Sequence, residues 1–122
     1  MKYLLAAILI TGTVQAATLE ITNKTGYEMR IVMLHNKCDI FEIPKDKPVY
    51  LQPNEAYKVA GLTPVVQSID VCGVGICMMS AIGMKKDMVY KVDIVLDQGF
   101  IDYKATPDHW TGTNTKCPNE KK

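Results

Sequence analysis

Residues 88–104 read MVYKVDIVLDQGFIDYK, and this stretch decides the fold class. Apolar side chains recur at every second position of its first half, and Lys91 and Asp93 stand between them. A period of two is typical of a β-strand with one buried and one solvent-facing side. Residues 97–99, Asp-Gln-Gly, then predict a tight hairpin whose glycine forms a left-handed bulge, and residues 100–104 form the returning strand.

Similar short runs recur along the rest of the chain. Strands are expected at residues 18–22, 27–33, 49–52, 56–60, 65–71 and 77–82. Residues 23–26, Asn-Lys-Thr-Gly, predict that the first two runs pair as an antiparallel hairpin. Pro44 and Pro48 disfavour regular structure in residues 35–47. No window of ten or more residues has helical periodicity, so the prediction is an all-β fold. It is a small antiparallel β-sandwich of seven or eight short strands, with a small β-barrel as the alternative.

The N-terminus, MKYLLAAILITGTVQA, has the pattern of a secretory signal peptide. Lys2 precedes an apolar run, and Val14 and Ala16 occupy the −3 and −1 positions of a cleavage site. The predicted organisation is a signal peptide at 1–16, a β-sandwich domain at 17–104 and a polar tail at 105–122. An uncleaved anchor is the alternative for the first segment. The protein is therefore expected to be secreted or periplasmic, and its short charged region favours a bacterial source.

The charge balance argues against two classes of partner. The chain has 14 Lys and Arg and 13 Asp and Glu, and the predicted signal peptide contains only one of them, Lys2. The exported part is then neutral, which argues against nucleic acid and against attraction to an anionic membrane surface. No segment after the signal peptide is apolar for long enough to span a membrane.

Four cysteines, Cys38, Cys72, Cys77 and Cys117, all lie in the exported part. An even number in an oxidising compartment favours disulfides, and four cysteines allow three pairings. We favour Cys72–Cys77, because four residues between them suit a hairpin loop, together with Cys38–Cys117. Loop entropy gives about 2 kcal/mol for the short ring and about 4.5 kcal/mol for the long one, which would also tie the tail to the domain.

The sulfur-rich stretch VCGVGICMMSAIGM, residues 71–84, raises the alternative of a soft-metal site. Candidate copper ligands are Met78, Met79, Met84 and Met88 with the thiols, and candidate zinc ligands are His35, Cys38, His109 and Cys117. Neighbouring methionines point to opposite faces of a strand, so both cannot reach one ion. We therefore favour core packing for the methionines and expect no metal or cofactor.

No catalytic motif is present: there is no Gly-x-Ser-x-Gly, no His-Glu-x-x-His and no phosphate-binding glycine loop. The protein is therefore not expected to be an enzyme. Trp110, the sole tryptophan, either pins the polar tail to the domain or forms an exposed platform for a ligand, with Asp108 and His109 as polar partners.

These observations favour an exported, disulfide-stabilised β-sandwich that binds a protein or a glycan and has no catalytic site. The alternative is a periplasmic copper- or zinc-binding protein with Cys, Met and His ligands. Binding is expected at loops and tail, through Trp110, His109, Asp108 and His35, because a Cys38–Cys117 bond would bring the tail to the 35–48 loop. An exposed strand edge is the alternative location. The oligomeric state is not predicted.

Overall fold

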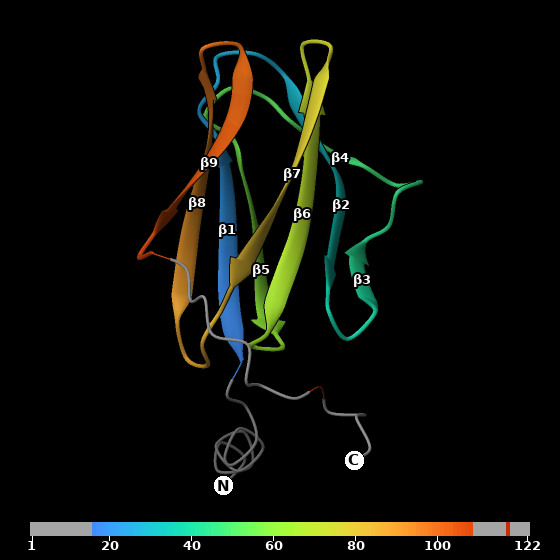
Figure 1. Cartoon of the computed structure of the whole chain (residues 1–122), viewed down its shortest axis with the longest axis vertical. Helices are drawn as coiled ribbons and strands as arrows, with labels where there is room; N and C mark the ends of the chain where they lie inside the picture. Colours follow the sequence, from blue (N-terminus) through green and yellow to red (C-terminus); the bar gives the residue numbers. More distant parts are fainter. Residues whose placement is uncertain (1–15, 109–116, 118–122) are drawn as a thin grey trace, which may run out of the picture.

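The structure is a computed structural model that describes residues 16–108 and Cys117 (Figure 1). Nine strands pack as two sheets of a β-sandwich that is not closed into a barrel, which confirms the all-β fold and removes the barrel alternative. The strands are β1 (Ala17–Asn23), β2 (Met29–Asn36), β3 (Ile40–Ile43), β4 (Val49–Leu51), β5 (Ala56–Leu62), β6 (Val66–Gly73), β7 (Ile76–Gly83), β8 (Val89–Asp97) and β9 (Phe100–Thr106).

One sheet has the strand order β5-β1-β8-β9, and the other has the order β3-β2-β6-β7, with β4 also paired to β2. The core lies between them. Strand β1 alternates buried and half-buried positions along its whole length. In β8 the predicted alternation is confirmed, because Tyr90, Val92 and Ile94 are buried and Lys91 is exposed. Each fully buried side chain of this kind stabilises the fold by about 1.5–3 kcal/mol.

The predicted hairpins at 97–99 and between Cys72 and Cys77 are present, and both turns are two residues long. Asp97 pairs directly with Phe100, and Gln98 and Gly99 both have positive φ. The hairpin is therefore confirmed and the predicted bulge is wrong, because no extra residue is inserted. The returning strand β9 continues to Thr106, two residues beyond the predicted end.

The β6–β7 hairpin has a shorter loop than the four residues between its cysteines suggest. Gly73 pairs with Ile76, so the ladder continues past the cysteines and only Val74 and Gly75 form the turn. Their φ values are 46° and 82°, which are the left-handed values that a two-residue turn between twisted strands requires.

The predicted hairpin between the first two runs is wrong. Strand β1 pairs antiparallel with β5 and parallel with β8, whereas β2 belongs to the other sheet, so the first sheet is mixed. Asn23 explains the change of sheet. Its fully buried amide nitrogen donates to the carbonyls of Tyr27 (2.7 Å) and Leu51 (2.9 Å), and its Oδ1 accepts from the backbone N–H of Thr25 (3.0 Å). These bonds direct the chain across the sandwich.

The region predicted to be irregular contains the end of β2 and all of β3, which brings the strand number to nine. Strands β3 and β4 pair with successive parts of the same strand, β2. Pro44 and Pro48 stand between them. Proline has no N–H to donate to a ladder, so the edge is interrupted at this point.

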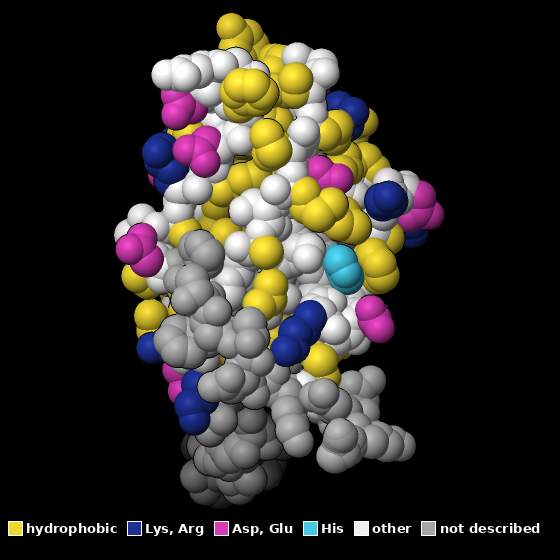
Figure 2. Space-filling model, viewed as in Figure 1, with side chains coloured by type: hydrophobic (Ala, Val, Ile, Leu, Met, Phe, Trp, Pro, Cys, Tyr) yellow, Lys and Arg dark blue, Asp and Glu magenta, His cyan; other side chains and the backbone are white. Residues whose placement is uncertain are grey.

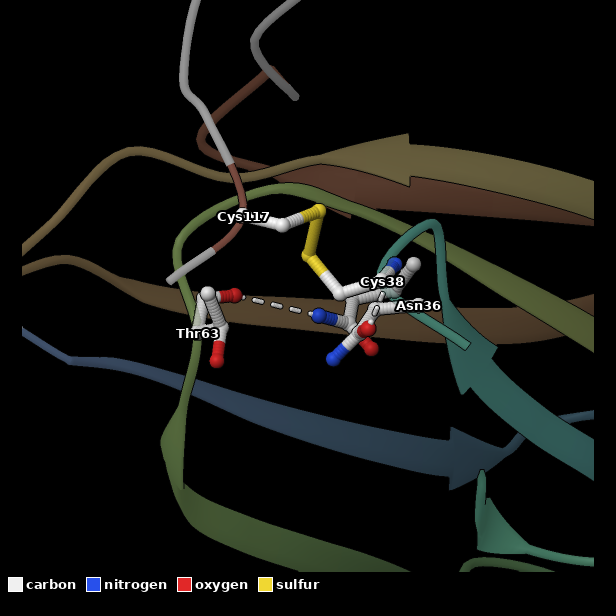
Figure 3. Close-up of a disulfide and its surroundings, with 5 residues drawn as sticks. Asn36, Cys38, Thr63 and Cys117 are labelled. Carbon is white, nitrogen blue, oxygen red and sulfur yellow. Dashed lines mark hydrogen bonds between the residues drawn. A yellow bond between two sulfur atoms is a disulfide. The ribbon is translucent and has the colours of Figure 1, made fainter. Parts of the chain in front are cut away.

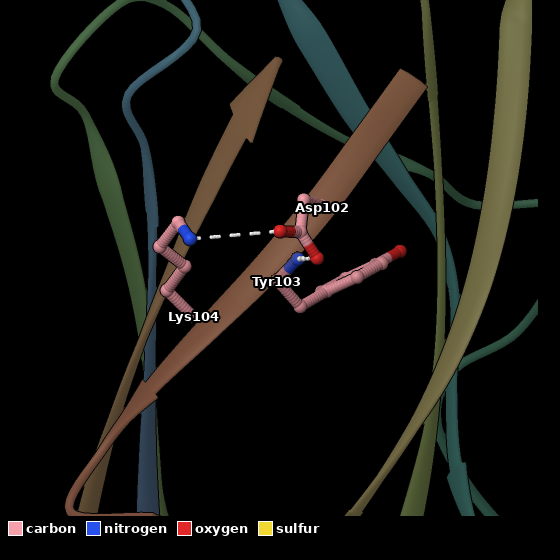
Figure 4. A network of polar contacts seen from close by, with 3 residues as sticks. All are labelled: Asp102, Tyr103 and Lys104. Atoms are coloured by element: carbon pink, nitrogen blue, oxygen red, sulfur yellow. Dashed lines mark hydrogen bonds and ion pairs between the residues drawn. The ribbon is translucent and has the colours of Figure 1, made fainter. Parts of the chain in front are cut away.

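Tyr103 joins the free edges of the two sheets. Figure 4 shows its ring reaching from β9 toward β7, where its hydroxyl donates to the carbonyl of Met78 at 2.5 Å. Burial raises the pKa of Tyr103 well above its usual value, and the charge of Asp70 adds to this, while the backbone N–H of Val71 acts in the opposite direction. The neighbouring Lys104–Asp102 ion pair (3.6 Å) is exposed.

Candidate functional site

The structure confirms both predicted disulfides. Cys38 bonds to Cys117 with a Cα–Cα distance of 5.5 Å, and Cys72 bonds to Cys77 with a distance of 4.0 Å. Two disulfides indicate folding in an oxidising compartment, whereas the signal peptide at 1–16 lies outside the described residues except for Ala16. Because all four cysteines are bonded, none is a free thiol ligand, and the thiol-based copper and zinc sites are not formed.

Cys38 lies in the turn between β2 and β3, which is itself well ordered by hydrogen bonds (Figure 3). The Oδ1 of Asn36 accepts from the N–H of Cys38 (2.9 Å), and the N–H of Asp39 donates to the Asn36 carbonyl (2.9 Å). The backbone N–H of Lys37 donates to the carbonyl of Val66 on β6 (3.1 Å). The disulfide thus fixes Cys117 to one end of the five-stranded sheet.

The predicted ligand-binding residues fall in three different places. His35 lies on β2, and its ring stacks on Phe41 of β3 with a centroid distance of 4.7 Å and an interplanar angle of 13°. Asp108 is exposed just after β9, at an edge of the other sheet. His109 and Trp110 lie outside the described residues, so the pin and the platform stay predictions.

The methionines divide between core and surface. Met84 is 1% exposed and packs in the core, as predicted. The prediction is wrong for Met78 and Met79, which are 37% and 57% exposed. The physical reason is that β7 is the edge strand of its sheet and pairs only with β6, so its side chains have neighbours in the sheet on one side only.

In the described part of the chain, no group of three or more His, Cys, Asp or Glu side chains is arranged to hold a metal ion. Residues 16–108 also contain no helix that could cross a membrane. The surface features that remain are therefore those of the sheets themselves.

Cross-strand register defines a continuous surface on the side of the five-stranded sheet that faces away from the core, here called the outer face. Three rows of directly opposed residues run across it. They are Tyr50–Arg30–Cys72–Cys77, Met33–Asp70–Met79 and Phe41–His35–Ser68–Ala81. In Figure 2, hydrophobic side chains gather over β6, β7 and β2.

Large apolar side chains of the outer face are exposed to solvent. Phe41 is 53% exposed, and Tyr50 and Met79 are each 57% exposed. Met33 is buried although it is not part of the core cluster between the sheets. Single exposed apolar residues are ordinary, so it is their grouping on one face that distinguishes this surface.

The two sheets differ in charge. The four-stranded sheet carries Glu20, Lys58, Lys91, Asp93, Asp97, Asp102 and Lys104, whereas the five-stranded sheet carries Arg30, Glu42 and Asp70 and no lysine. Glu42 does not belong to the outer face, because its charge acts on Tyr57 in the opposite sheet. Burial of Tyr57 is the larger cause that raises the pKa of this tyrosine, and the charge of Glu42 is the second. One sheet thus has a solvated exterior, and the other has an exterior almost without charge.

The two charges of the outer face are not paired with each other or with neighbours. Within residues 16–108, Arg30 and Asp70 make no ion pair and no side-chain hydrogen bond, and both are half-buried. The Nδ1 of His35 is also buried without a hydrogen-bond partner among the described residues. Buried polar atoms are normally satisfied, so the Nδ1 of His35 is an exception among the described residues.

The sequence prediction missed this face because it searched for sites in loops and in the tail. The usable signal was the absence of lysine from residues 27–33, 65–71 and 77–82, whereas residues 88–104 contain Lys91 and Lys104. No family model matches this chain, and no curated protein is significantly similar to it. The functional assignment therefore depends on the geometry.

Proposed function

We propose that this protein is an exported, disulfide-stabilised binding module that recognises a protein partner through the outer face of its five-stranded sheet. The observation that carries the proposal is the exposure of Phe41, Tyr50 and Met79 on a sheet surface almost free of charge. Monomeric proteins rarely expose contiguous apolar patches larger than a few hundred Å², and larger patches mark sites of association.

The residue types of the face support a protein partner. Tyrosine, phenylalanine, methionine and arginine are enriched in protein interfaces, while lysine and glutamate are depleted from their centres. The row Met33–Asp70–Met79 forms the middle of the face, and the aromatic side chains of Tyr50 and Phe41 stand on its β3–β4 side. This arrangement supplies apolar anchors with a polar group between them.

The disulfides support the same role. Cys72–Cys77 lies within the first row of the face and joins β6 to the edge strand β7. Cys38–Cys117 fixes Cys117 next to the turn that follows His35. Trp110 and His109, predicted from the sequence as ligand-binding residues, are a few positions along the chain from that anchor, so we propose that they contribute at the edge of the same interface.

A photo-reactive amino acid placed on each sheet in turn tests the proposal in the producing cell. Replacement of Met79 puts the probe on the outer face, and replacement of the exposed Lys91 puts it on the charged sheet as the matched control. We expect covalent protein adducts from position 79 and few from position 91. Equal yields from both positions would contradict the assignment, and adducts that contain carbohydrate would favour a glycan ligand.

A further inference from the structure

We infer that the protein partner of the outer face is a second copy of this chain, so that two sandwiches pack face to face about a two-fold axis. The inference rests on the proposed function and names the partner. The outer face has the property that such symmetry requires, which is complementarity to itself.

The self-complementarity lies in its two charges. Arg30 is directly opposite Cys72, and Asp70 is two residues before Cys72 on the same strand. From the spacing and rise of β-strands, the two positions are about 8 Å apart on one surface. Consider a two-fold axis that lies in the plane of the face and crosses the line from Arg30 to Asp70 at right angles, at its midpoint. Rotation about this axis places Arg30 of each copy over Asp70 of the other. One rotation therefore forms two equivalent ion pairs.

The second copy supplies what the single chain lacks. Arg30 and Asp70 are half-buried among apolar side chains and have no ion-pair partner within residues 16–108. A partner that covers this face would remove water from both charges, which is unfavourable unless each is paired, and a facing charge of opposite sign pairs both at once. A partner with an unrelated surface would have to provide the same pattern independently.

The apolar part of the face is compatible with this symmetry. Met33 and Met79 stand on either side of Asp70 in one row, so each copy presents thioether side chains around the predicted ion pairs. Methionine is flexible and polarisable, and it adapts its shape to an irregular opposing surface. Phe41 and Tyr50 add aromatic surface on the β3–β4 side.

The size of the face is also adequate. Four strand positions side by side, with β2, β6 and β7 each eight residues long, give an outline of about 19 by 26 Å, or about 500 Å². The relief of the side chains makes the accessible area larger than this outline. The face then approaches the roughly 600–1,000 Å² that each partner buries in a specific interface.

Sedimentation equilibrium of the purified exported protein, with both disulfides intact, gives the first test. We expect wild-type protein at micromolar concentration to have twice the mass of one chain. Arg30→Asp and Asp70→Arg each place like charges opposite each other in both pairs, and we expect each to weaken dimerisation by at least about a hundredfold.

The decisive measurement combines the two substitutions. The R30D/D70R double variant reverses both charges and is expected to dimerise again. An equimolar mixture of the two single variants is expected to form a heterodimer, because one chain then carries two carboxylates and the other two guanidinium groups at the paired positions. Lys91→Asp on the charged sheet is the control, and it is expected to keep the wild-type mass.

Circular dichroism and melting temperature identify any variant that fails to fold, and Met79→Lys then provides a second way to disrupt the same face. A monomeric wild type, dimers that survive both single substitutions, or a mixture that forms no heterodimer would overturn the inference. Monomers that still give protein adducts from position 79 would refute self-association and leave the proposed binding function in place. Absence of adducts would refute both.

Discussion

Asn23 is the residue on which the connection between the two sheets depends. Its side chain is fully buried and bonds to the Leu51 carbonyl on β4 and to the loop that leaves β1. Asn23→Ala would leave two carbonyls without their donor. We expect the free energy of unfolding, measured by urea denaturation, to fall by about 2–3 kcal/mol. Lys24→Ala, at the exposed neighbouring position, is the control, and its effect is expected to stay within about 0.5 kcal/mol. Equal effects from both would contradict this role.

Val74 presents the opposite case, a residue whose replacement is expected to stabilise the fold. It is β-branched, has a φ of 46° and is 50% exposed at the tip of the β6–β7 hairpin. The left-handed region costs such a residue about 1–2 kcal/mol, whereas Asn tolerates it and is preferred in this turn.

The Val74→Asn variant is therefore expected to raise the free energy of unfolding by about 1 kcal/mol, as thermal or urea denaturation would show. Val89 is similarly exposed but lies in an extended strand, so Val89→Asn should stabilise nothing. A loss of stability in Val74→Asn would mean that the turn differs from the one described.

At the scale of elements, the contact between β7 and β9 makes stability depend on pH. The Tyr103 hydroxyl donates to the Met78 carbonyl, and burial raises its pKa in the folded state above the value of about 10 expected in the unfolded chain. Below pH about 10, the phenol is protonated in both states and its contribution is complete. Above it, the unfolded chain loses the proton first, so the free energy of unfolding falls as pH rises.

Tyr103→Phe removes both the hydrogen bond and this titration. We expect it to lower the free energy of unfolding by about 1 kcal/mol near neutral pH and to reduce the decline above pH about 10. Urea denaturation of both proteins across that range measures the two effects. Tyr57, whose pKa is also raised, titrates in both proteins and therefore does not affect the comparison. Identical pH slopes would contradict the assignment.

How far the sequence predicts the elements depends on how local their causes are. The alternation in β8 and the two tight turns arise from neighbouring residues, so they are predictable. The pairing of β1 is not, because the hydrogen bond that turns the chain joins residues 23 and 51. The apolar run of β7 indicates burial on both sides, and only the strand order shows that this strand is at an edge.

At the scale of the molecule, both disulfides were predicted correctly, whereas the outer face was not. The disulfides follow from compartment, spacing and loop entropy, which the sequence contains. The outer face consists of residues from β2, β3, β4, β6 and β7, and its low charge becomes visible only when the strands are assigned to sheets. Arg30 and Asp70 are 40 positions apart in the sequence, and only the pairing register of β2 with β6 shows that they are neighbours on one surface.

The two disulfides are expected to contribute unequally to the stability of the whole molecule. Cys38–Cys117 joins residues 79 positions apart, whereas Cys72–Cys77 joins residues 5 apart within one hairpin. The loop-entropy model gives about 4.5 kcal/mol for the first and about 2 kcal/mol for the second. The C38A/C117A variant should therefore lose more free energy of unfolding than C72A/C77A, by about 2 kcal/mol.

Denaturant unfolding of the two double variants beside wild type measures this difference. The C72A/C77A variant has a second expected consequence, because its disulfide lies in the first row of the outer face beside Arg30. Its loss should loosen edge strand β7 and weaken self-association while most of the stability is kept, whereas C38A/C117A should do the reverse. If both variants lost stability and association in the same proportion, the short disulfide would have no separate role at the interface.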